Sequence, residues 1–160
     1  MFELIRVDPW IYVLAITIVP WIELRGAIPV GILQYGLDPV KVFLAATFMN
    51  VMIILPLFIF LDWFFHIIEK IPLFDRIISR IQRKAGPYVE KYGEVGLALF
   101  VGMPLPGTGA YSGSLAAHIL GIKNRRAYIG IASGVVIAGV IITLASTILY
   151  ESLGFLLNTL

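Results

Sequence analysis

The sequence predicts an all-α integral membrane protein, and three observations support this prediction. Of the 160 residues, 59% are apolar and 14% are charged, whereas soluble domains carry roughly 25% charged residues. Two uncharged runs, residues 42–61 and 127–150, reach the length of about 20 residues that a membrane-spanning helix needs. Proline and glycine interrupt two further apolar stretches. We expect a single membrane domain over residues 1–160, with the N-terminus retained in the mature protein.

The first interrupted stretch consists of two short uncharged runs, residues 9–22 and 27–37. Each is too short to span a bilayer, and Glu23 and Arg25 stand between them. Two interpretations remain open: a kinked single span with both charges at its centre, or a re-entrant hairpin whose half-helices reach the midplane and return. Three residues in this region favour a break in the helix: Pro20, Gly26 and Pro29.

The second interrupted stretch, residues 95–122, carries no charged side chain, and its middle at 104–113 reads PLPGTGAYSG. Non-helical backbone at bilayer depth must be buried in protein or line a wet cavity, because each unpaired N–H or C=O costs several kcal/mol. Free N–H groups at the start of the returning half-helix predict an anion-binding terminus, with Thr108 or Ser112 as the N-cap. The alternative is a tight packed turn without a ligand.

The linker, residues 62–94, combines apolar and basic residues at helical spacing. We expect an amphipathic pair of helices in the membrane interface, broken at Pro72 and ended by Gly86 and Pro87. The basic residues at 76–84 also suit a platform for anionic lipid or a partner protein.

The order of short run, break, short run and full span occurs twice, in residues 9–61 and 95–150, before a short tail at 151–160. We therefore expect two inverted repeats, each a re-entrant helical hairpin plus a transmembrane helix, joined by an amphipathic interfacial helical linker. This topology places most basic residues on one side, as the positive-inside rule requires, so that the linker is cytoplasmic and both termini lie outside the cell membrane. One side holds Lys70, Arg76, Arg80, Arg83, Lys84, Lys91, Lys123, Arg125 and Arg126, and the other holds Arg6 and Lys41.

Ionisable residues at membrane depth are functional candidates by default. Glu23 is the candidate carboxyl that binds and releases a proton, and Arg25 is its partner or an anion contact; a purely structural ion pair is the alternative. His118 and Asn50 are candidate relays, although a carbonyl partner or an interhelical hydrogen bond also explains them. The expected substrate or ion site comprises Glu23, Arg25, Gly26, Pro29, Pro104, Pro106, Gly107, Thr108, Gly109, Tyr111 and Ser112.

Other chemistry has little support in the sequence. The chain has no cysteine, which excludes disulfides and thiolate metal ligands. No metal-ligand cluster, nucleophile–base pair or nucleic-acid motif is visible, so we expect no metal, no cofactor, no nucleic-acid partner and no enzymatic activity. The expected partners are membrane lipids, a small-molecule or lipid substrate, a proton as coupling ion, and a second copy in a homodimer. Gly130 and Gly134 form a small-xxx-small pattern that predicts a close helix contact.

Residues 23–29, ELRGAIP, and residues 104–113 resemble the paired motifs of the putative small multidrug export family, a distant relative of the DedA superfamily. The resemblance covers nearly the whole chain and implies two inverted re-entrant hairpins that face each other at the midplane. DedA relatives have been linked to proton-coupled transport, polyprenyl-phosphate recycling and lipid scrambling. The second hairpin of this chain has no acid or arginine, unlike DedA members with charged residues in both hairpins.

These observations predict a membrane transporter that couples proton flow to export of small amphipathic compounds, through a midplane site between the two hairpins. One alternative is a DedA-like polyprenyl-phosphate or phospholipid translocase or scramblase, in which Arg25 and the half-helix N-terminus bind phosphate. The other alternative is a non-transporting membrane scaffold.

Overall fold

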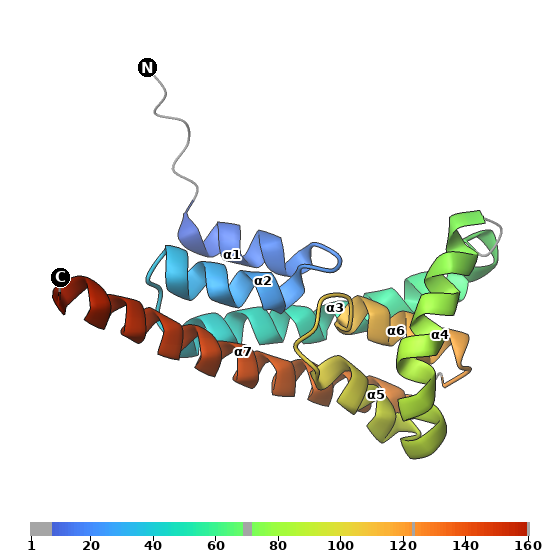
Figure 1. Ribbon diagram of the computed structural model, residues 1–160. Coiled ribbons are helices and arrows are strands. Elements are labelled where there is room, and N and C mark those ends of the chain that lie inside the picture. The colour runs from blue at the N-terminus through green and yellow to red at the C-terminus, as the bar shows by residue number, and fades with distance from the viewer. Residues whose placement is uncertain (1–7, 69–71, 123, 160) are drawn as a thin grey trace.

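The computed structural model describes residues 8–68, 72–122 and 124–159, and the regular elements of these ranges are all helical. Figure 1 shows their arrangement. The elements are α1 (Pro9–Ile18), α2 (Glu23–Pro29) continued by a π-helical turn η1 (Val30–Gln34), α3 (Pro39–Ile68), α4 (Pro72–Tyr92), α5 (Glu94–Gly102), α6 (Ala110–Ile119) and α7 (Arg125–Thr159). Arg6, Lys70 and Lys123, which enter the charge-based orientation, lie outside the described residues.

Three helices begin at a polar side chain that accepts a hydrogen bond from a first-turn backbone N–H, at 2.8 to 2.9 Å. These side chains are Asp8 for α1, Asp38 for α3 and Asn124 for α7. Pro9 and Pro39 follow the two aspartates at the first helical position, where a missing N–H costs nothing. Each cap contributes about 1 kcal/mol and fixes where the helix starts.

α3 and α7 contain the helical segments Pro39–Phe64 and Arg125–Leu156, which are long and apolar enough to cross a bilayer. This confirms the two long apolar helices expected from the sequence. Both are longer than expected, and residues 151–159 of the expected tail continue α7 as helix. Without a proline to stop it, an established helix adds residues at little cost.

The remaining apolar segments form two helix pairs, α1 with α2 and α5 with α6, which contact α3 and α7. In Figure 1 the α1–α2 pair lies along the half of α7 that ends at the C-terminus, the α5–α6 pair lies along the other half, and the turns of the two pairs meet. The second break falls at residues 103–109 as expected, but the first falls at 19–22 and not at Glu23 to Gly26. Gly26 stays helical because its missing side chain makes room for Ile22.

Glycines of α7 set how closely its neighbours approach. A β-carbon at Gly130 or Gly134 would overlap the backbone carbonyl oxygen of Glu94 or Ala98 on α5. The close helix contact predicted from the spacing of these glycines is therefore confirmed. Gly139, one and a half turns further on, packs against the side chains of Phe43 and Thr47 on α3. The missing side chains of these glycines let α5 and α3 pack closely against α7.

α4 runs across the end of the bundle that lies away from the C-terminus (Figure 1). The helix continues to Tyr92, so the predicted end at Gly86 and Pro87 is wrong. Ala85 and Val89, on either side of this site, are buried, and their packing offsets the one hydrogen bond that Pro87 cannot donate. The basic residues of α4 are exposed whereas Ile81, Ala85 and Val89 are buried, so that α4 is amphipathic as expected.

Candidate functional site

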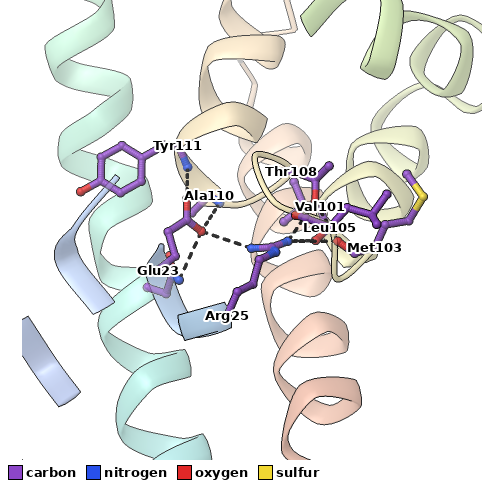
Figure 2. Close-up of polar contacts among 9 residues, drawn as sticks. Glu23, Arg25, Val101, Met103, Leu105, Thr108, Ala110 and Tyr111 are labelled. Atoms are coloured by element: carbon purple, nitrogen blue, oxygen red, sulfur yellow. Dashed lines mark hydrogen bonds and ion pairs between the residues drawn. The ribbon is translucent and has the colours of Figure 1, made fainter. Parts of the chain in front are cut away.

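The Glu23 carboxylate is buried, with 2% of the residue exposed, and it lies at the N-terminus of α6 (Figure 2). Its Oε2 accepts the backbone N–H of Ala110 at 2.9 Å, and its Oε1 accepts the N–H of Tyr111 at 3.2 Å. Arg25 Nη1 and Asn50 Nδ2 also donate to Oε2, at 3.3 and 3.4 Å. An acid of the first helix pair therefore satisfies the free N–H groups that begin a helix of the second.

Gly109 is the N-cap of α6, and its lack of a side chain explains how Glu23 reaches the helix end. A β-carbon at Gly109 would overlap the Glu23 carboxylate. The prediction that Thr108 or Ser112 caps α6 is wrong, because α6 has no side-chain cap of its own. The Thr108 hydroxyl donates instead to the carbonyl oxygen of Met103 at 2.7 Å, which closes the turn between α5 and α6.

Arg25 completes the same arrangement at the end of α5 (Figure 2). Its Nη2 donates to the carbonyl oxygens of Val101 at 2.7 Å and Met103 at 3.2 Å, and to Thr108 Oγ1 at 3.2 Å. Helix C-termini leave carbonyl groups unpaired and carry a partial negative charge, which a cation stabilises. The two charges of α2 thus meet two helix ends of opposite sign.

We call this set of contacts the polar network: Glu23, Arg25, Asn50 and Thr108 with the facing ends of α5 and α6. The backbone that presents it is strained, since Trp21 and Glu23 have φ angles of 68° and 51°. Such left-handed conformations in residues other than glycine cost about 1–3 kcal/mol each. The bonds of the polar network hold Glu23 in this conformation and so tie the first turn to the second.

A cavity of about 340 Å³ borders the polar network at Arg25, and the C-terminal half of α7 forms part of its wall. We call it the Arg25 cavity, because Arg25 is the charged residue among its lining side chains. Pro29 and Pro104, both predicted site residues, bring α2 and the second turn to its wall. The rest of the lining is Leu33, Ile141, Ile142, Ala145, Ser146 and Leu149.

A larger cavity, of about 560 Å³, lies toward α4, and we call it the α4 cavity. Its lining residues are Trp21, Arg76, Arg80, Ile81, Lys84, Phe100, Pro106, Gly107 and Ser112. The site expected from the sequence includes Pro106, Gly107 and Ser112. It does not include the basic residues Arg76, Arg80 and Lys84. Their spacing of four residues, which puts them on one helical face, was the available signal.

The two candidate relays lie in different places. Asn50, one of the two candidate relays, is fully buried and joins the polar network through Glu23. His118, the other candidate, is buried elsewhere, with Nδ1 at 3.5 Å from Oδ1 of Asp62. Asp62 lies 12 residues beyond Asn50 on the same helix, which corresponds to about 18 Å. Gly26, another predicted site residue, packs against Ile22 at the start of α2 and Ile16 of α1.

A family profile described as putative small multi-drug export protein matches residues 23–141, more than half of the chain. The chain belongs to this family. The matched range begins at Glu23 and contains every residue of the polar network. No curated protein and no solved structure matches significantly. Membership of a small multi-drug export family, together with two apolar helices of spanning length, identifies the chain as a membrane protein.

Proposed function

We propose that the chain is a membrane transporter for the export of small amphipathic compounds, and that the polar network is its closed gate. The observation that carries the proposal is that both charges of α2 bind helix ends of the other pair, with a cavity bordering the network on each side. In this proposal the two helix pairs are re-entrant hairpins of an inverted repeat. Their turns, which meet along α7 in Figure 1, support it.

The proposed coupling ion is a proton, and Glu23 is its proposed site. Four donors point at the Glu23 carboxylate, and an ionised carboxylate accepts all of them. A proton on this group neutralises the carboxylate, so that the charge attraction to Arg25 disappears and the hydrogen bonds from the four donors weaken. Proton binding thereby weakens the contact between the two turns, which is the physical route from a pH gradient to opening.

A transport assay in proteoliposomes tests this proposal. The purified protein is reconstituted, a pH gradient is imposed, and flux of a fluorescent lipophilic cation and of a fluorescent alkyl phosphate is measured. We expect gradient-dependent flux that Glu23→Gln makes independent of the gradient. Glu151→Gln is the matched control, because Glu151 is exposed near the end of α7. Full gradient dependence in Glu23→Gln, or no flux of either compound, contradicts the proposal.

A phospholipid or polyprenyl-phosphate translocase is the second candidate, and the Arg25 cavity favours it. The charge that borders this mainly apolar cavity is a guanidinium, which suits a phosphate head group better than a cationic drug. Flux of the alkyl phosphate alone selects this candidate, and a scaffold without transport predicts flux of neither. We further propose that α4 faces the cytoplasm and both termini face outward, and that the transporter is a homodimer.

A further inference from the structure

We propose that the α4 cavity is a binding site for the anionic head group of an amphiphile, of phosphate-type chemistry. The inference rests on the proposed function only in that this cavity is one of the two bordering the polar network. Binding itself requires no transport, so the two proposals are able to fail separately.

The charge of the cavity points to an anion. Arg76, Arg80 and Lys84 stand one helical turn apart on α4 and line the same cavity. The ion pairs given by the structure within residues 8–68, 72–122 and 124–159 belong to other side chains, those of Arg25 and His118. Gathering like charges is unfavourable unless a counter-charge joins them, and a group with several anionic oxygens supplies it.

The other walls of the cavity point to an amphiphile in preference to a free ion. Trp21 is 64% exposed beside the basic residues, and the neighbouring wall is formed by Ile81, Phe100 and Pro106. Ser112, at the start of α6, adds a hydroxyl to this lining. A volume of about 560 Å³ is within the range of small-molecule pockets. An anionic head against α4 with apolar atoms against Trp21 matches both walls.

The position of the cavity gives the ligand a structural consequence. Its lining comes from three places: α4, the first turn through Trp21, and the second turn through Pro106 and Gly107. The Gly107 backbone is left-handed, with φ of 80°. It faces open space at the cavity, because a β-carbon there would meet nothing within 4 Å. A bound head group therefore links α4 to both turns that carry the polar network, and occupancy should stabilise the folded protein.

The experiment measures thermal stabilisation of the purified full chain in neutral detergent. The probes are dioctanoyl phosphatidic acid, dioctanoyl phosphatidylcholine with identical chains, and inorganic phosphate, since binding to the folded state raises stability with ligand concentration. We expect concentration-dependent stabilisation by the phosphatidic acid alone. Phosphatidic acid carrying brominated chains should also quench tryptophan fluorescence, and Trp21→Phe should remove that quenching.

The decisive comparison uses two double variants with the same loss of charge. Arg76→Ala with Arg80→Ala should weaken phosphatidic acid binding by at least about tenfold. Arg83→Ala with Lys91→Ala is the matched control, because both residues are exposed on α4 and line no part of the cavity. The control should bind as the wild type does. Melting of each variant without ligand verifies that it is folded.

Several outcomes overturn the inference. Equal weakening in both double variants would mean a general attraction of α4 to anionic surfaces and no built site. Equal stabilisation by phosphatidylcholine would remove the role of the anionic head. Inorganic phosphate binding as tightly as phosphatidic acid would reject the amphiphile and leave a site for the free anion. Arginine-dependent binding in a protein that shows no flux would uphold this inference and refute the proposed function alone.

Discussion

Glu23→Gln should destabilise the protein far more than its small change in shape suggests. The substitution keeps the size of the side chain but removes the charge that faces Arg25, whose side chain is itself 10% exposed. It also replaces one acceptor oxygen by an amide N–H₂ group, which repels a backbone N–H of Ala110 or Tyr111. The variant therefore leaves the buried Arg25 without its counter-charge and at least one buried donor without an acceptor.

The expected loss is about 3 kcal/mol of unfolding free energy. Charge-assisted hydrogen bonds contribute about 1.5–3 kcal/mol each, and removing one partner of a buried ion pair costs about 3–5 kcal/mol. The lower part of this range is appropriate in a membrane, where unfolded helices find other partners for their polar groups. The Asn50 contact, at 3.4 Å, adds little to the sum.

Equilibrium unfolding in mixed micelles measures this loss, with Glu151→Gln as the exposed control, expected within about 0.5 kcal/mol of wild type. A double-mutant cycle with Arg25→Met isolates the coupling. The double variant should be less destabilised than the sum of the single variants by about 1 kcal/mol or more. A Glu23→Gln loss no larger than that of the control would refute the argument that the polar network joins the two helix pairs.

Gly109→Ala should destabilise the fold as strongly as Glu23→Gln, because the new methyl group displaces the Glu23 carboxylate from α6. Gly86→Ala lies inside α4, where a β-carbon would meet nothing within 4 Å. In the same unfolding assay it should be neutral or stabilising by up to about 1 kcal/mol; equal losses of stability in Gly109→Ala and Gly86→Ala would contradict the steric argument. The pKa of Glu94 is lowered because Asn124 Nδ2 donates to its carboxylate. The ionised Glu94 carboxylate therefore contributes its full stabilisation above the unfolded-state pKa. This stabilisation is lost as the pH falls through the lower folded-state pKa. Wild type should exceed Glu94→Gln in unfolding free energy at about pH 7, and this difference should shrink as the pH falls below the unfolded-state pKa of about 4.3; a constant difference would show that the carboxylate charge is irrelevant.

Much of the fold was predictable because membrane helices follow from length, hydropathy and breaks. The uncharged runs at 42–61 and 127–150 predicted α3 and α7, and the prolines and glycines at 104–109 predicted the second turn. The ends of the helices were harder to predict from the sequence. Pro87 was expected to end its helix and residues 151–160 were assigned to a short tail, yet tertiary packing and helix propagation carried both helices onward.

The candidate site was predictable as a set of residues but not as a set of bonds. Charges at membrane depth singled out Glu23 and Arg25, and the broken segment singled out Thr108 and Gly109. Their roles depend on contacts between positions more than 75 residues apart in the chain, which no local pattern contains. Gly109 is an N-cap without a side chain. The reason for a glycine there becomes clear only from the structure, in which the Glu23 carboxylate of the other helix pair occupies that space.

If the polar network is a gate, the two turns must separate during export. The chain has no native cysteine, and the Tyr111 hydroxyl donates to the carbonyl oxygen of Ile18 at 2.6 Å, so Ile18→Cys with Tyr111→Cys places one thiol on each helix pair. Flux is measured in proteoliposomes before and after a short reducible bifunctional thiol reagent, with each single variant as control. We expect that cross-linking stops flux and that reduction restores it. Undiminished flux through the cross-linked protein would contradict a gate made by the polar network.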